Sequence, residues 1–256
     1  MNIAMIGLGK MGANMARRLS RGGATVFGFD LNADTRSQLV AEEANFKAFA
    51  SVPELIAALP TPRVVWLMLP SGDISEAAFT EMKTLLAPGD LIIDGANAMY
   101  KDSQRHGAEL SALNIKFVDA GVSGGVWGLQ NGYCLMFGGD KDAAAMAEPF
   151  MKILAPGAER GWTHTGPAGS GHYTKMLHNG IEYGMMQAFA EGFAMLKAKE
   201  EFNLDVAAIS ETWCHSSVVR SWLLELAADT LEQDTELDDL NPLVPDSGEG
   251  RWSVLE

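Results

Sequence analysis

The stretch Ile3–Gly12, which reads IAMIGLGKMG, decides the fold. Four apolar residues form a short strand pattern, and the glycine-rich turn after them leads into a helical pattern that reaches about Arg21. Gly7 permits the tight turn, Gly9 lets the backbone approach a pyrophosphate, and Gly12 allows the helix to pack closely on the strand. Because a helix N-terminus offers N–H groups and a positive dipole to an anion, this pattern predicts a dinucleotide site in preference to a simple tight turn.

Asp30 closes the second predicted strand, 23 residues after Gly7. A carboxylate at this place can accept hydrogen bonds from both hydroxyls of an adenosine ribose, although a polar residue can also simply end a strand. The carboxylate repels a 2′-phosphate, and neither Leu31 nor Asn32 supplies a cation to bind one. We therefore predict NAD as the cofactor, while Arg36 is near enough along the chain to leave NADP as the alternative. The expected cofactor contacts are Gly7, Leu8, Gly9, Lys10, Met11, Gly12, Asp30, Leu31, Leu69, Pro70 and Asn97.

Composition narrows the class of protein. The 256 residues are 47% hydrophobic and 20% charged, which suits a folded core and excludes a disordered or collagen-like chain. A net charge of −14 disfavours nucleic-acid and membrane partners. Cys134 and Cys214 lie far apart without a C-x-x-C spacing, and no apolar run approaches the roughly 20 residues that span a bilayer. We expect a cytoplasmic protein with reduced thiols and no metal.

Short apolar runs alternate with helical patterns over the first two thirds of the chain. Such runs are typical of parallel strands buried on both faces, so we predict a doubly wound α/β Rossmann domain over residues 1–165. Beyond about Gly169 only helical periodicity remains, over Gly171–Lys199 and Asp205 to about Thr230, which predicts an all-α substrate and dimerisation domain over 166–256. The predicted strands are Ile3–Ile6, Thr25–Phe29, Val64–Leu69, Leu91–Ile93, Phe117–Ala120 and Leu135–Phe137.

The first of these long helices carries one polar stripe. At 100° per residue, Lys175, His178, Asn179 and Glu182 fall within a wedge of roughly 100°. Mainly apolar residues and glycines fill the rest of the circumference, so we expect the helix to be buried and the stripe to line a cleft. A solvated Lys and Glu face is the alternative.

A lysine removed from water loses proton affinity. Lys175 can then accept a proton from a substrate hydroxyl as hydride leaves for nicotinamide, and its ammonium can polarise the new carbonyl so that a β-keto acid loses CO2. Glu182 is placed to return a proton to the resulting enediol carbon. His178 and Asn179 would orient the substrate, although a buried histidine is often only structural.

Three stretches resemble a known family, the decarboxylating 6-phosphogluconate dehydrogenases, and in particular their short bacterial form. They are Asp94–Asn97 (DGAN), Gly121–Gly125 (GVSGG) and Gly171–Gly184 (GHYTKMLHNGIEYG). The resemblance implies that Lys175 is the proton acceptor and Glu182 the proton donor. It also implies that the sugar acid is surrounded by Asn97, Ser123, Gly124, Gly125, His178, Asn179 and Tyr183.

The resemblance further points to Arg220, in SVVRS, as a ligand of the substrate phosphate. An arginine in a helix is more often a surface residue, but a phosphosugar needs local positive charge on so acidic a chain, and a guanidinium suits phosphate geometry. Family members usually read D-G-G-N where this chain has Ala96, which could tighten the loop beneath the nicotinamide.

Relatives also continue past the segment 246–252, and the last four residues, Ser253–Glu256, have the spacing of a capping box that has no helix to open. We therefore expect a truncated C-terminus.

The resulting hypothesis is an NAD-dependent oxidative decarboxylation of 6-phosphogluconate to ribulose 5-phosphate and CO2 in the pentose phosphate pathway, by a homodimer or higher homo-oligomer. One alternative is another β-hydroxyacid dehydrogenase, which acts on a small acid without phosphate. A second is a truncated module that binds a dinucleotide without turnover.

Overall fold

The computed structural model describes residues 1–241, 243 and 248–255. The chain divides into two compact units, Met1–Lys175 and Met176–Glu256, which we describe separately. Within the described residues, no helix combines the length and the apolar character that a membrane span requires.

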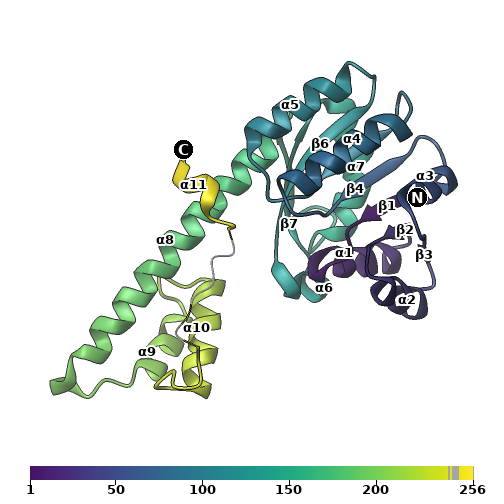
Figure 1. Cartoon of the computed structure of the whole chain (residues 1–256). Helices are drawn as coiled ribbons and strands as arrows, with labels where there is room; N and C mark the ends of the chain where they lie inside the picture. The colour runs from purple at the N-terminus through teal and green to yellow at the C-terminus, as the bar shows by residue number, and fades with distance from the viewer. Residues whose placement is uncertain (242, 244–247, 256) are drawn as a thin grey trace. The chain divides into compact units, whose positions relative to one another are not determined.

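An eight-stranded sheet forms the centre of the first unit, in the order β3-β2-β1-β4-β5-β6-β7-β8. Figure 1 labels β1 to β4, β6 and β7 of this sheet. Neighbouring strands from β3 to β6 pair in parallel, β7 runs antiparallel to β6, and β8 is parallel to β7. The strands are β1 (Asn2–Ile6), β2 (Thr25–Phe29), β3 (Phe46–Ala48), β4 (Val64–Leu67), β5 (Leu91–Asp94), β6 (Lys116–Ser123), β7 (Cys134–Gly139) and β8 (Trp162–Gly166).

Helices cover both faces of this sheet, which confirms the doubly wound α/β fold. Met15 of α1 (Lys10–Arg21) and Met151 of α7 (Lys141–Leu154) belong to one buried cluster, with Trp66 from the sheet. Leu55 and Phe79 belong to a second cluster, with Ile92 from the sheet. The remaining helices of the unit are α2 (Ala33–Glu42), α3 (Val52–Ala58), α4 (Asp73–Leu85), α5 (Tyr100–Ser111) and α6 (Gly128–Asn131), with a 3₁₀ turn at Gly125–Trp127.

Three features of the sheet differ from the sequence prediction. The strands β3 and β8 were not predicted, because the first has only three residues and the second reads WTHTG, which lacks an apolar run. The antiparallel direction of β7 was also not predicted, since buried strands of either direction have the same apolar composition.

The second unit is helical, as predicted. Its longest element is α8 (Ser170–Ala198), which begins in the first unit and is followed by α9 (Val206–Trp213), α10 (Trp222–Gln233) and α11 (Arg251–Leu255). The prediction of one helical stretch from Asp205 to about Thr230 was wrong, because 214–221 is a connection between α9 and α10. Ser221 ends that connection as the N-cap of α10, where its hydroxyl accepts a hydrogen bond from the Leu224 N–H at 3.2 Å.

Ser253 does not open a helix either. It lies inside α11, and its hydroxyl donates to the carbonyl oxygen of Met176 at 2.5 Å. Glu256, the other half of the expected capping box, lies outside the described residues.

Candidate active site

The turn between β1 and α1 has the form of an anion cradle. Gly7 has φ +92°, and a Cβ on it would lie 2.3 Å from the Met68 carbonyl oxygen. A Cβ on Gly12 would lie 2.1 Å from the Gly7 oxygen, whereas a Cβ on Gly9 would meet no atom of the described residues within 4 Å. The first turn of α1 has neither a side-chain cap nor an acidic residue. The open approach at Gly9, together with the uncapped helix start, fits a dinucleotide pyrophosphate.

The Asp30 carboxylate lies directly on this turn. Its Oδ2 accepts a hydrogen bond from the Leu8 N–H at 2.7 Å, and its Oδ1 accepts one from the Asn32 N–H at 2.8 Å. Arg36 Nη1 donates to the carbonyl oxygen of Asp30 and, at 3.4 Å, to that of Leu31. The end of β2 therefore presents a carboxylate and a guanidinium within one short segment, which is the pair of groups that distinguishes NAD from NADP.

The other expected cofactor contacts follow the carboxyl ends of parallel strands. Leu69 and Pro70 come after β4, and Asn97 comes after β5. Asp94, the last residue of β5, is 1% exposed, and its Oδ1 accepts from the Ala96 N–H at 3.1 Å. Burial raises the pKa of the Asp94 carboxyl above its usual value. Because the carboxyl ends of these strands lie at one edge, the sheet brings these residues to the same edge as the glycine turn.

The turn Ser123–Gly125 follows β6. Ser123 pairs across the sheet with Cys134, and burial raises the pKa of that thiol. Gly124 has φ +137° and Gly125 has φ +51°, conformations that side chains with a Cβ rarely adopt. The two glycines therefore let the backbone turn sharply at the end of the strand.

Lys175 lies in the second turn of α8, and its side chain rests on β6. A Cβ added to Gly121 of β6 would lie 2.3 Å from the Lys175 Cβ, so only a glycine leaves room for the lysine stem. The residue is 8% exposed. Below it, the buried Asp119 carboxylate accepts hydrogen bonds from the N–H groups of Gly169 and His172, both at 2.7 Å. Lys175 thus lies one turn beyond a helix start that is capped by Asp119, a residue of the sheet.

The remaining polar stripe of α8 belongs to the second unit. His178 Nδ1 lies 3.2 Å from Asn179 Oδ1 and 3.6 Å from Glu182 Oε2. Asn179 is 1% exposed, and its Nδ2 donates to the Glu249 carbonyl oxygen at 3.0 Å. The histidine and the glutamate are half-buried.

The apolar side of α8 is less buried than predicted. Leu177 is 48% and Ile181 65% exposed, while Met176 is buried. The described residues therefore cover only part of the circumference of this helix.

Two exposed arginines of the second unit are candidates for a phosphate ligand. Arg220, the residue expected from the resemblance, is exposed and directly precedes the N-cap of α10. Arg251, for which the sequence predicted no role, is the first residue of α11 and is also exposed. The segment around Arg251 contacts α8 through Glu249 and Ser253. The signal for it in the sequence was a cation close to two glycines, in the stretch Gly248–Arg251 (GEGR).

Asp119 and Gly121 were also given no individual role. A charged residue inside an otherwise apolar strand was the signal for Asp119. Among the described residues, no group of three or more His, Cys, Asp and Glu side chains is arranged to hold a metal ion.

Comparison with known proteins agrees with this arrangement. Residues 2–166 match the model described as the NAD binding domain of 6-phosphogluconate dehydrogenase, and residues 171–256 match that of the 6-phosphogluconate dehydrogenase C-terminal domain. A Bacillus subtilis protein named as a 6-phosphogluconate dehydrogenase, YqeC, is 40% identical over 99% of the chain and 84% of its own length. An NAD(+)-dependent, decarboxylating 6-phosphogluconate dehydrogenase of Haloferax volcanii is 37% identical over 100% of the chain and 84% of its own length.

Among solved structures, the 6-phosphogluconate dehydrogenase of Plasmodium falciparum matches with a TM-score of 0.90 and 27% identity, over 100% of this chain and 57% of that one. A 3-hydroxyisobutyrate dehydrogenase of Mycobacterium tuberculosis matches with a TM-score of 0.73 and 25% identity, over 99% of this chain and 93% of that one. The two family models together account for nearly every residue, with a glycine cradle in one and the polar stripe of α8 in the other; the chain belongs to the 6-phosphogluconate dehydrogenase family.

Proposed function

We propose that the chain catalyses the NAD-dependent oxidative decarboxylation of 6-phosphogluconate to ribulose 5-phosphate and CO2. The observation that carries the proposal is the placement of Lys175, buried against Gly121 at the start of the helix that also bears His178, Asn179 and Glu182. Family membership, and the names of the relatives that match nearly the whole chain, support the substrate and the reaction.

The glycine turn, Asp30 and the residues after β4 and β5 would hold the dinucleotide. NAD, when bound, supplies the acceptor for the hydride that leaves the substrate carbon. In the first step Lys175 Nζ accepts the proton of the hydroxyl on that carbon, which becomes a ketone β to the carboxylate. A lysine largely withdrawn from water suits this role, because it can be neutral before the step and cationic after it.

The second step releases CO2. The Lys175 ammonium returns its proton to the ketone oxygen while the bond to the carboxyl carbon breaks, and the electron pair remains in an enediol. Glu182 then protonates the carbon that lost CO2, and the enediol hydroxyl gives its proton back to Lys175. Glu182 is half-buried, and His178 lies beside both Glu182 and Asn179. Because these polar groups lie next to the proton donor, we assign His178 and Asn179 to orienting the carboxylate and the hydroxyls of the substrate.

Asn97, Ser123, Gly124, Gly125 and Tyr183 complete the proposed substrate contacts. For the phosphate we propose an arginine of the second unit, because the chain has 33 acidic against 19 basic residues and an anion needs a local cation. Comparing Arg220→Ala with Arg251→Ala separates the two candidates. The variant that lacks the phosphate ligand should raise KM for 6-phosphogluconate while leaving the affinity for NADH unchanged.

We further propose that the enzyme works as a homodimer or higher homo-oligomer in the cytoplasm. The exposed apolar side chains of α8, among them Leu177, Ile181 and Met195, favour association with another copy. Both cysteines are free thiols, in agreement with a reducing compartment. Fractionation of cells with an antibody against the chain tests the location.

A second candidate function is oxidation of a small β-hydroxyacid without phosphate, which is favoured by the 93% coverage of the 3-hydroxyisobutyrate dehydrogenase structure. Parallel assays of NADH formation with 6-phosphogluconate and 3-hydroxyisobutyrate decide between them, and release of CO2 is measured in the same samples. We expect kcat/KM to be higher for 6-phosphogluconate and one CO2 to form per NADH. Equal or higher kcat/KM for hydroxyisobutyrate would remove the first assignment.

A further inference from the structure

A buried polar cluster lies where α8 begins, and it consists of Ser103, Asp119 and His172. All three belong to the first unit, and none is more than 2% exposed. Ser103 comes from α5, Asp119 from β6 and His172 from the first turn of α8, so the cluster joins three elements that are distant in sequence. Burying polar groups costs free energy unless hydrogen bonds offset it, so the hydrogen bonds to Asp119 and the Ser103–His172 pair stabilise this arrangement.

The contacts within the cluster fix the helix start at two points. Asp119 accepts hydrogen bonds from the backbone N–H groups of Gly169 and His172, and thus acts as an N-terminal cap supplied by a neighbouring strand. The His172 ring is held separately, because Nδ1 lies 2.7 Å from Ser103 Oγ. One contact therefore fixes the backbone of the first turn, and the other fixes its rotation about the helix axis.

The packing beneath the first turn leaves little freedom for adjustment. A Cβ on Gly171 would lie 2.4 Å from the Asp119 carbonyl oxygen and 2.7 Å from that of Met136. The helix thus rests on the backbone of β6 and β7. Lys175 follows His172 by three residues, so it lies on the next turn of the same face.

We propose that Ser103 and His172, together with the cap at Asp119, are positioning residues that hold Lys175 in the orientation needed for proton transfer. The proposal rests on the proposed function of Lys175. The physical reason is that proton transfer requires hydrogen-bond reach between the amine and the hydroxyl, and a rotation of the first turn of α8 would carry the lysine stem away from Gly121.

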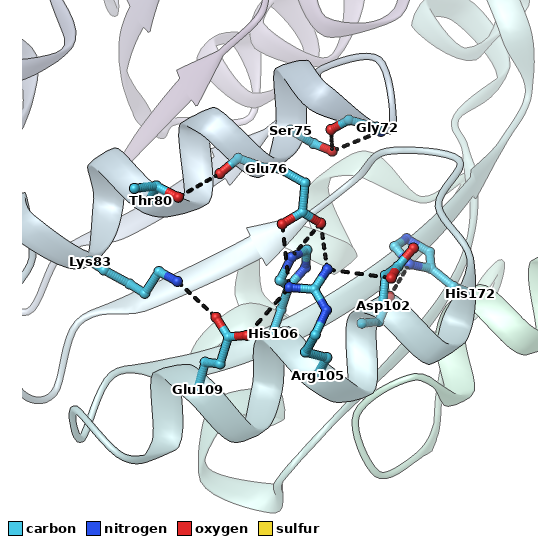
Figure 2. Close-up of polar contacts among 11 residues, drawn as sticks. Gly72, Ser75, Glu76, Thr80, Lys83, Asp102, Arg105, His106, Glu109 and His172 are labelled. Atoms are coloured by element: carbon cyan, nitrogen blue, oxygen red, sulfur yellow. Dashed lines mark hydrogen bonds and ion pairs between the residues drawn. The ribbon is translucent and has the colours of Figure 1, made fainter.

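The fold offers a matched control on the same helix. His106 follows Ser103 by one turn of α5, is 4% exposed, and stacks on Phe79 with 3.9 Å between ring centroids. Its Nε2 lies 3.0 Å from Glu76 Oε1, and Arg105 also contacts Glu76 (Figure 2). His106 is thus a histidine of similar burial that joins α5 to α4, whereas His172 joins α8 to α5.

The experiment compares His172→Leu, Ser103→Ala, the double variant and the control His106→Leu. For His172→Leu and Ser103→Ala we expect kcat to fall at least about tenfold, while KM for 6-phosphogluconate and Kd for NADH stay within about twofold. The kcat of the double variant should be no lower than that of the slower single variant, because each single substitution already removes the same contact between Ser103 and His172. His172→Asn, whose amide can replace Nδ1 opposite Ser103, should recover most of the lost kcat.

Hydrogen exchange, read by mass spectrometry on the peptide around residues 170–176, supplies a readout that does not depend on turnover. Exchange there should be faster in His172→Leu and Ser103→Ala than in His106→Leu. Unchanged exchange, or an equal loss of kcat in the control, would overturn the proposal. If the unsubstituted protein does not turn over 6-phosphogluconate, the proposed function fails, and the exchange measurement still decides whether the cluster positions the lysine.

Discussion

The start of α8 and its later turns are parts of one helix but have different surroundings. At the start, His172, Lys175 and Met176 are buried, and glycines bring the helix onto the backbone of the sheet. Further along, Leu177 and Ile181 are exposed although they are apolar. Helical periodicity is the same in both parts, so the comparison teaches that the surroundings decide burial. The first part is fixed by the fold of a single chain, and the second is the part for which we propose contact with another copy.

Lys175→Met tests the chemistry assigned to the buried start of α8, and it should have the largest effect on activity. We expect kcat to fall by about 10²–10⁴-fold, the usual contribution of a general base. NADH affinity, measured by calorimetry, should be nearly unchanged, because methionine fills a similar volume and the glycine turn lies elsewhere in the unit. Weakened NADH binding would mean that the lysine contacts the cofactor instead.

Ile181→Glu tests the later turns of α8, where apolar side chains are exposed. If this side chain is buried between copies, a charge there should weaken the oligomer by at least about tenfold, since burying an isoleucine contributes roughly 1.5–3 kcal/mol. Light scattering across a dilution series measures the mass. Val40→Glu is the control, because Val40 is an apolar residue of α2 that is 50% exposed. An unchanged mass for Ile181→Glu would contradict the proposed interface.

Gly121→Val sharpens the contrast by crowding the lysine stem. The new side chain would start 2.3 Å from the Lys175 Cβ, and we expect a loss of about 1–3 kcal/mol in the free energy of unfolding together with a lower kcat. Urea unfolding and initial rates measure the two effects. Gly192→Ala lies on a later turn of α8, where a Cβ meets no atom of the described residues within 4 Å, and should instead gain about 0.5–1 kcal/mol in the free energy of unfolding. Equal stabilities would show that the helix start can move off the sheet.

Asp30→Ala tests the proposed cofactor site, which lies in the same unit as the start of α8. Removing the carboxylate removes its repulsion of a 2′-phosphate, so the ratio of kcat/KM for NAD to that for NADP should fall by about tenfold, or about 1.4 kcal/mol. Asp34→Ala, which removes an exposed acid from the first turn of α2, should leave the ratio unchanged. The same ratio in both variants would mean that Asp30 does not contact the ribose.

Asp94→Asn should have the smallest effect. Burial raises the pKa of Asp94 in the folded chain, so the folded state binds this proton more tightly than the unfolded chain does. The resulting stability is present at low pH and is lost as the pH rises through the raised pKa. Asparagine does not ionise and can still accept from the Ala96 N–H, so we expect a higher Tm at pH 7 and little change at pH 4. A gain of about 1 kcal/mol corresponds to about 2–4 °C. A lower Tm at pH 7 would show that the charged form is stabilised.

Asp90→Asn provides the opposite case. Asp90 is equally buried but forms an ion pair with Arg63 at 3.0 Å. Removing one member of a buried pair leaves the other unpaired, so this variant should lower Tm at pH 7.

Local sequence patterns were sufficient for much of the fold and for the type of chemistry. The period of the apolar residues predicted most strands, the cover of helices on both faces and the extent of α8. The same patterns failed to predict β3 and β8. The first is short and the second is polar, and both are strands only because neighbouring strands pair with them in the sheet. The patterns also failed at 214–221, where the Ser221 cap divides a continuous helical pattern into two helices.

The residue types for the proposed site were evident in the chain, because glycines, an acid after a strand and a lysine with a glutamate seven residues later can be recognised by spacing. What holds those residues was decided by tertiary structure. Asp119 caps a helix that begins 51 residues later, and Gly121 is small because a lysine from that helix crosses it. Periodicity carries information only between residues a few positions apart, whereas caps, close approaches and buried pairs join segments that meet only after the chain has folded.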